Sequence, residues 1–260
     1  MCRRADTERI TVDVEEHVAT IEFHRPKKYN ALNDDIMLDI LRAFDGIQLD
    51  RSIEAVIITG EGDDAFSAGA DITEYAGPAD EHDPLQKELQ DLFYEMYTKP
   101  LECHAPVIAK INGYCVGGGL IVAMYCDIRV AVEEAKFGVP VTDIGQIPTG
   151  GSTRRAIELV GEAKAKEIVY TAGYIDAEEA EKIGLINHAV EASELDATVD
   201  SIVERITETG TKAVKNSKKA MNYAAQASDL ADAREFEAEV WWEQFATEER
   251  RRLVDEFNES

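Results

Sequence analysis

The chain has 260 residues, of which 52 are Asp or Glu and 27 are Lys or Arg, so its formal net charge is −25. Nucleic acid is a poor partner for so acidic a surface, because phosphate binding requires clusters of Lys and Arg. No apolar run approaches the roughly 20 residues that a membrane-spanning helix requires, and a hydrophobic content of 45% is typical of a globular protein with a large core.

The acidic residues are spread along the chain rather than gathered in a tail. We interpret this distribution as a halophilic adaptation to a salty cytoplasm, where charges are screened beyond roughly 3 Å at molar salt. The basic N-terminal residues have no apolar stretch behind them, so we expect no signal peptide and a cytoplasmic location. The cysteines form no Cys-x-x-Cys pair and have no histidine at metal-ligand spacing, so we expect reduced thiols and no metal site; they are Cys2, Cys103, Cys115 and Cys126.

The N-terminal segment predicts a hairpin followed by an amphipathic helix. Apolar and polar residues alternate over residues 8–23 around a polar turn at residues 15–17. Pro26 ends the second strand, and Asn33 is a favourable N-cap for the helix that follows. The apolar residues of that helix have the spacing of one helical face; they are Ile36, Leu38, Ile40, Leu41 and Phe44.

The next unit runs from a strand through a turn to a helix. The apolar residues 55–60 predict a buried strand, and the small residues at 67–72 predict a turn that leads into a helix. Asp71 and Glu74 have the Asp-x-x-Glu spacing of a capping box at a helix start. A further helix is expected over residues 85–101, with its apolar residues on one face.

A third strand, residues 106–110, leads to Gly117-Gly118-Gly119 and then to an apolar helix that ends near Cys126. Glycine takes backbone conformations that other residues avoid, and a helix start presents unpaired N–H groups at the positive end of its dipole. Such a place stabilises anions, including an anion that exists only during a reaction. Taken alone, the three glycines are equally consistent with a tight turn that packs a helix closely on a sheet.

The remaining chain changes from mixed to helical composition. We expect a strand at 127–132, an irregular segment at 137–148, a helix near Arg154 capped by residues 149–153, helices at 162–171 and 176–183, a strand within 184–190, and helices at 193–209, 211–226 and 232–257. This pattern predicts an α/β core over residues 1–195 and a helical oligomerisation region over residues 196–260. Trp241 and Trp242 predict a packed subunit or domain contact in the second region.

Two segments together, residues 66–72 and 112–119, resemble the crotonase (enoyl-CoA hydratase/isomerase) superfamily in order and spacing, as does Phe137-Gly138-Val139-Pro140. The resemblance covers residues 10–250. It implies an α/β crotonase-like fold of repeated ββα units with a helical C-terminal trimerisation region, and trimers that pair into hexamers. It also implies an acyl-CoA thioester substrate whose coenzyme A is part of the substrate, with no separate cofactor.

The resemblance implies a set of site residues as well. The backbone N–H groups of Ala70 and Gly118 would bind the thioester oxygen as an oxyanion hole and stabilise an enolate. The turn with the sequence motif Arg-Pro-Lys-x-x-Asn-Ala-Leu would contact coenzyme A through Lys27, Lys28 and Ala31, although a solvated turn explains the two lysines equally well. The other residues expected at the substrate are Ala68, Asp71, Ile72, Gly117, Ile121 and Val141.

The acid–base residues depart from the family pattern. Family hydratases place one glutamate three residues after the middle glycine and another directly after the Phe-Gly-x-Pro proline, and here these positions are Ile121 and Val141. Two aliphatic side chains can neither orient water nor protonate carbon. Hydration therefore needs carboxylates from elsewhere, whereas decarboxylation of a malonyl-type thioester needs enolate stabilisation without a base.

Two further alternatives remain open. Double-bond isomerisation needs at least one base; the candidates are Glu74, Asp143, Tyr75, Tyr114 and Tyr125. Asp143 lies two residues past the second empty position, so an extended backbone would point it the same way as Val141, whereas a loop would redirect it. The alternative from a different class is a non-catalytic acyl-CoA-binding protein.

The C-terminus is a second departure. Many family members end in a basic segment that helps to hold coenzyme A phosphates, but residues 255–260 of this chain are acidic or neutral. Arg25, Lys27 and Lys28 are the cations expected to meet the phosphates. The lysines at 215, 218 and 219 are an alternative, although their spacing is more typical of a solvated helix face.

Overall fold

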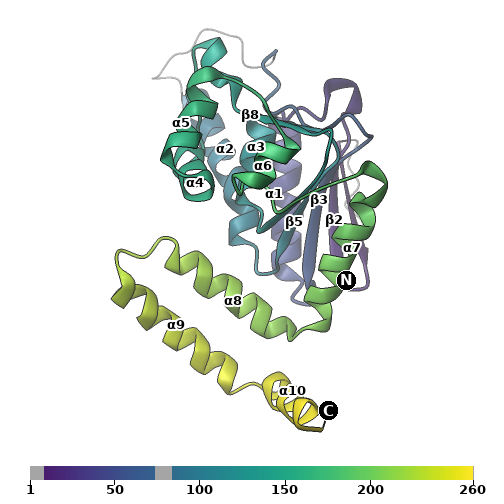
Figure 1. The fold of residues 1–260 in the computed structure, drawn as a ribbon, viewed down its shortest axis with the longest axis vertical. Helices are drawn as coiled ribbons and strands as arrows, with labels where there is room; N and C mark the ends of the chain where they lie inside the picture. Colours follow the sequence, from purple (N-terminus) through teal and green to yellow (C-terminus); the bar gives the residue numbers. More distant parts are fainter. Residues whose placement is uncertain (1–8, 74–83, 260) are drawn as a thin grey trace.

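Two β-sheets with covering helices form the body of the molecule in the computed structural model, which describes residues 9–73 and 84–259 (Figure 1). The larger sheet has the order β1-β2-β3-β5-β7-β10, and the smaller sheet has the order β4-β6-β8-β9. The larger sheet consists of β1 (Ile10–Glu15), β2 (Val18–Phe23), β3 (Ala55–Gly60), β5 (Val107–Ile111), β7 (Ile128–Val132) and β10 (His188–Val190). The smaller sheet consists of β4 (Ala65–Ser67), β6 (Tyr114–Val116), β8 (Lys136–Gly138) and β9 (Ile175–Asp176).

The predicted hairpin is confirmed. Strands β1 and β2 pair antiparallel, from Ile10 opposite Phe23 to Glu15 opposite Val18. Glu16 and His17 form the turn, and Glu16 has a φ of 52°. From β2 onward, β3, β5, β7 and β10 continue the larger sheet in parallel.

The chain repeats a ββα unit, which confirms the expected fold. The first unit is β1, β2 and α1 (Asp34–Leu49); the next two are β3, β4 and α2 (Pro84–Glu102), then β5, β6 and α3 (Gly118–Tyr125). The second and third units each give one strand to the larger sheet and one to the smaller. Because β4 and β6 pair in parallel, the turns that follow them leave the smaller sheet at the same edge.

A local signal explains the start of α1 but not that of α4. Asn33 Oδ1 accepts a hydrogen bond from Ile36 N at 3.2 Å, which confirms the predicted cap of α1. Of the five apolar residues predicted for one face of α1, Leu38 is instead exposed. The helix expected near Arg154, α4 (Ser152–Val160), begins earlier, and its N-cap Gly151 offers no side-chain acceptor.

The segment expected to be irregular, residues 137–148, is partly ordered: β8 is followed by the 3₁₀ helix η2 (Pro140–Ile144). Strand β9 was not expected. The predicted helices at 162–171 and 176–183 and the predicted strand within 184–190 are present as α5 (Glu162–Thr171), α6 (Ala177–Lys182) and β10. Two further 3₁₀ helices are η1 (Pro26–Lys28) and η3 (Ala192–Glu194).

The C-terminal helices differ in how they relate to the body. Helix α7 (Leu195–Glu208) lies along the sheet and buries Leu195, Val199 and Val203 in the main core. Helices α8 (Thr211–Ala224), α9 (Leu230–Phe245) and α10 (Glu248–Glu259) extend away from the strands (Figure 1).

The prediction of one helix over residues 232–257 is wrong. The chain breaks between α9 and α10, where Thr247 Oγ1 accepts a hydrogen bond from Arg250 N at 3.2 Å, as an N-cap does. None of the helices within residues 9–73 and 84–259 has both the length and the apolar composition needed to cross a bilayer.

Candidate active site

Two bends of the backbone meet beside the N-terminus of α3. One bend follows β4 and contains Gly69 and Ala70; the other follows β6 and contains Gly117 and Gly118. A Cβ placed on Gly69 would lie 2.5 Å from the Gly118 nitrogen and 2.9 Å from the Val116 carbonyl oxygen. Since real Cβ atoms do not approach other atoms so closely, only glycine at position 69 allows the two bends to touch.

The first bend is fixed by a short parallel bridge to Leu32. Leu32 N donates to the Gly69 carbonyl at 2.7 Å, and Asp71 N donates to the Leu32 carbonyl at 2.8 Å. Backbone groups of an extended segment alternate in direction, so the N–H of Ala70 is directed away from Leu32. No hydrogen bond from Ala70 N to any described residue is present.

The second bend is fixed by Gly117, which has a φ of 53° and donates its N–H to the Gly138 carbonyl at 2.8 Å. Gly118 is the first residue of α3, so its N–H belongs to the unpaired donors at the positive end of the helix. A Cβ on Gly118 would lie 3.4 Å from the Ala70 nitrogen. The structure therefore brings the two predicted oxyanion-hole residues together.

The turn expected to contact coenzyme A lies next to the first bend. Asp71 Oδ2 accepts a hydrogen bond from Arg25 at 2.9 Å and lies 3.6 Å from Lys28 Nζ, while Arg25 also donates to the Ala31 carbonyl at 2.8 Å. The hydrogen bonds from Thr73 Oγ1 and from Arg25, followed by the Lys28 charge, hold the pKa of Asp71 below its ordinary value. Arg25, Lys28, Ala31 and Asp71 thus form one cluster.

The other predicted binding residues are distributed around this cluster. Lys27 is exposed on η1, and the Ile72 side chain is 58% exposed. Ala68 is half-buried, and its N–H donates to the Tyr29 carbonyl at 2.8 Å. Glu74, and with it the predicted capping box, lies outside the described residues, as does Tyr75.

Ile121 and Val141, the positions at which family hydratases have glutamates, are apolar residues in apolar surroundings. Ile121 lies one turn into α3 and is buried, and Val141 is half-buried against the hydrophobic core. Asp143 lies on the 3₁₀ helix η2, so the extended backbone that would align it with Val141 is absent, and its side chain is exposed. The structure does not bring Asp143 to the two bends through any hydrogen bond or ion pair among described residues.

The other side chains considered for a chemical role do not point to one. Tyr125 Oη donates to the Gly150 carbonyl at 2.7 Å, and Tyr114 is exposed. Cys115 is buried, and burial raises the pKa of its thiol well above the ordinary value, so it is an inert thiol rather than a nucleophile.

One residue near the bends was not identified from the sequence. Tyr97 of α2 was assigned only to an apolar helix face, yet its Oη lies 2.5 Å from the position that a Gly118 Cβ would take. The only sequence signal is that a buried tyrosine hydroxyl normally requires a partner.

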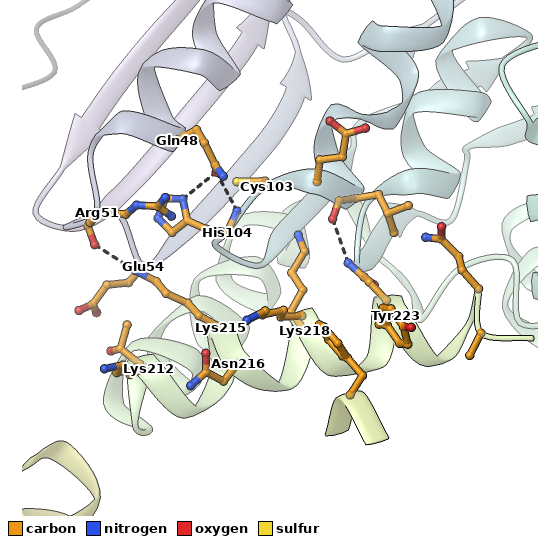
Figure 2. Close-up of a pocket in the computed structure, with 18 of the residues that line it drawn as sticks. Gln48, Arg51, Glu54, Cys103, His104, Lys212, Lys215, Asn216, Lys218 and Tyr223 are labelled. Carbon is orange, nitrogen blue, oxygen red and sulfur yellow. Dashed lines mark hydrogen bonds between the residues drawn. The ribbon is translucent and has the colours of Figure 1, made fainter. Parts of the chain in front are cut away.

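The lysines of α8 lie elsewhere, around a cavity of about 1110 Å³ between α8 and the loops before β3 and β5 (Figure 2). Lys215 Nζ donates to the Arg51 carbonyl at 3.1 Å. The expectation of a solvated face is wrong for Lys218, which is buried and bonds to Asp127 at 2.6 Å and to the Pro100 and Ala105 carbonyls. These loops lead into the N-terminal ends of β3 and β5, whereas the two bends follow the C-terminal ends of these strands by way of β4 and β6. The lysine cluster therefore lies at the opposite end of the strands from the two bends.

His104 lies in the same cavity and adds no positive charge to it near neutral pH. Its ring nitrogens lie 3.0 Å from Gln48 Oε1 and 3.3 Å from the Ile53 carbonyl. Burial, followed by the Lys215 charge, lowers the pKa of His104 to about 4.

Comparisons with known proteins agree on one family. The family model described as enoyl-CoA hydratase/isomerase matches residues 13–260. The chain is 40% identical over 256 residues to a crotonyl-CoA hydratase of Syntrophomonas wolfei, covering 97% of this chain and 95% of that protein. It is 38% identical over 251 residues to a short-chain-enoyl-CoA hydratase of Clostridium acetobutylicum, covering 96% and 94%.

The fold is similar to that of solved proteins with comparable names. The crystal structure of an enoyl-CoA hydratase from Bacillus anthracis matches with a TM-score of 0.91 and 31% sequence identity, and the match covers 96% of both chains.

Proposed function

Because the chain belongs to the enoyl-CoA hydratase/isomerase family, we propose that it transforms an acyl-CoA thioester through an enolate held by the N–H groups of Ala70 and Gly118. The observation that carries this proposal is the contact between the two bends, in which a Gly118 Cβ would lie 3.4 Å from Ala70 N. One carbonyl oxygen placed there accepts hydrogen bonds from both groups.

The physical basis is preorganisation. Negative charge develops on the thioester oxygen as the enolate forms, and two fixed N–H donors stabilise that charge without reorienting. Removing a single donor of this kind costs about 3–4 kcal/mol in other enzymes. The bridge to Leu32 fixes the first donor, and the helix start fixes the second.

The cluster around Asp71 supplies the cations for coenzyme A. Arg25 and Lys28 already share the charge of Asp71, so they contribute less net positive charge to a phosphate than their number suggests. Lys27 is exposed beside them and makes no ion pair with a described residue. We expect Lys27 to be the strongest phosphate contact of the three.

A second candidate reaction is favoured by Ile121 and Val141. An apolar surrounding destabilises a substrate carboxylate, and decarboxylation of a malonyl-type thioester then breaks the carbon–carbon bond and releases CO₂. The electron pair of that bond moves into the enolate, whose oxygen the two N–H groups hold, and a proton from water completes the product. Hydration by this chain requires carboxylates from outside these two positions.

The test is a turnover assay with crotonyl-CoA, a 3-enoyl-CoA and methylmalonyl-CoA, together with calorimetric binding of each thioester. Turnover of at least one compound is the expected result, and the compound identifies hydration, isomerisation or decarboxylation. Binding of all three without turnover contradicts an enzymatic role and identifies an acyl-CoA-binding protein.

We also propose that residues 196–260 form the oligomerisation region of a cytoplasmic homotrimer or hexamer, next to a catalytic core of residues 1–195. Trp241 and Trp242 of α9 are 52% and 62% exposed, and the ring centroids of Trp241 and Phe245 lie 4.8 Å apart in a stacked pair. These side chains form an exposed aromatic surface suited to a second copy of the chain. Light scattering tests this proposal: we expect three or six chains per particle, and a monomeric wild-type protein contradicts it.

A further inference from the structure

Tyr97 places a hydroxyl group at the point where the two bends meet. Its side chain, from α2, is 2% exposed. The position that a Gly118 Cβ would occupy lies 2.5 Å from Tyr97 Oη and 3.4 Å from Ala70 N. The Tyr97 hydroxyl, the Ala70 nitrogen and Gly118 therefore surround one small space.

The ring of Tyr97 is held firmly in this place. Phe93, one turn earlier on α2, stacks on it with ring centroids 5.8 Å apart and an interplanar angle of 30°. On another side the ring lies against Gly150, where a Cβ would collide with Tyr97 Cδ2. Packing thus fixes the direction in which the hydroxyl points.

The hydroxyl has no hydrogen-bond partner within the protein that the structure describes. Buried tyrosines usually have one, as Tyr125 does at Gly150. Among the described residues, only Asn112 Oδ1 is a side-chain oxygen or nitrogen that is fully enclosed and has no hydrogen-bond partner. The Tyr97 hydroxyl also has no partner, so it must retain some exposed surface. It reaches a space in which a bound group can meet it.

We propose that the Tyr97 hydroxyl is a third hydrogen-bond donor to the thioester oxygen, acting with the N–H groups of Ala70 and Gly118 in the enolate state. This inference rests on the proposed function, because it assigns a further catalytic residue to the same site.

The protonation state of Tyr97 suits a donor and not a base. Burial raises the pKa of its hydroxyl above the ordinary value, so the phenol keeps its proton at any physiological pH. A neutral hydroxyl binds an enolate oxygen more strongly than a neutral carbonyl oxygen, because hydrogen bonds to charged groups are the stronger ones. Tyr97 therefore favours the enolate over the bound substrate.

The experiment compares two ligands on three proteins by calorimetry. Acetoacetyl-CoA forms an enolate readily, whereas butyryl-CoA carries an ordinary thioester carbonyl. Tyr97→Phe removes the hydroxyl and keeps the ring, and Tyr125→Phe makes the same chemical change at a hydroxyl that bonds the backbone. We expect Tyr97→Phe to weaken acetoacetyl-CoA binding by about 10- to 100-fold, the range for a hydrogen bond to a charged group, and butyryl-CoA binding by less than about threefold.

The control Tyr125→Phe is expected to lower thermal stability while leaving the ratio of the two affinities unchanged. An unchanged ratio in Tyr97→Phe, with both thioesters still bound and the thermal transition intact, overturns the role of Tyr97 and leaves the proposed function standing. If neither thioester binds to the wild-type protein, the proposed function fails and the inference fails with it.

Discussion

Gly69 and Gly118 approach so closely that a Cβ on the first would lie 2.5 Å from the amide nitrogen of the second. The two residues belong to different ββα units, and they meet because β4 and β6 are neighbours in the smaller sheet. The repeated unit therefore brings two backbone bends to one point. There the N–H groups of Ala70 and Gly118 have no hydrogen-bond partner among the residues that the structure describes.

Gly118→Ala should abolish turnover. The new methyl group would lie 2.5 Å from Tyr97 Oη and 3.4 Å from Ala70 N, in the space that the thioester oxygen requires. We expect at least a 100-fold fall in kcat, comparable with the loss of about 10²–10³ when one oxyanion-hole donor is removed. The control Gly161→Ala, at a glycine with a φ of 77° and no atom near its Cβ position, should lower stability and leave kcat unchanged. Equal kcat losses in both variants would show that strain, not blockage, is responsible.

The double substitution Ile121→Glu with Val141→Glu should create or increase hydration of crotonyl-CoA. The resemblance to the family implies that these positions correspond to the two glutamates of its hydratases, and positioned acid–base groups contribute about 10²–10⁴-fold in rate. The matched control is Ile121→Gln with Val141→Gln, which adds similar volume and polarity but transfers no proton. Hydration that rises equally in both double variants, or in neither, would contradict the assignment of these positions to the pocket.

Asp71 should make the stability of the fold depend on pH in the acidic range. Because its folded-state pKa lies below the ordinary value of about 3.9, its contribution is present above that value and is lost as the pH falls through the folded-state pKa. Asp71→Asn is expected to lower the free energy of unfolding by roughly 1–2 kcal/mol at pH 7. The difference from wild type should shrink as the pH falls through the lowered folded-state pKa of Asp71. Denaturant titrations measure both values, and Asp13→Asn, at an exposed strand position, is the control. A constant difference at all pH values would exclude the ion pair as its cause.

The net charge of −25 predicts strong dependence on salt. Self-repulsion between carboxylates should be screened in about 1 M KCl, where the Debye length is about 3 Å. If this screening raises the free energy of unfolding by a few kcal/mol, the melting temperature rises by roughly 5–10 °C. Sucrose at equal osmolality is the control, because it stabilises through exclusion and not through screening. A protein equally stable and active without added salt would refute the halophilic interpretation.

The sequence predicted the parts of the fold that depend on local patterns. The alternation around Glu16, the cap at Asn33 and the apolar run of β3 correspond to the observed hairpin, helix and buried strand. Thr247 was not recognised as a helix start, because the flanking residues continue a helical composition and only the hydrogen bond to Arg250 N reveals the break.

Contacts between distant segments could not be predicted in the same way. Nothing local distinguishes Lys218 from its neighbours, yet it alone of the three lysines is buried, because Asp127 and two backbone carbonyls from other segments meet its ammonium group. The same holds for Tyr97. Its helical spacing predicts a core residue, and only the three-dimensional structure shows that its hydroxyl lies next to Gly118.

The most direct test of the central claim is a crystal structure of the protein with acetoacetyl-CoA bound. We predict that the thioester oxygen lies within about 2.7–3.1 Å of both Ala70 N and Gly118 N. A thioester oxygen that contacts neither nitrogen, in a complex with fully occupied ligand, would contradict the account.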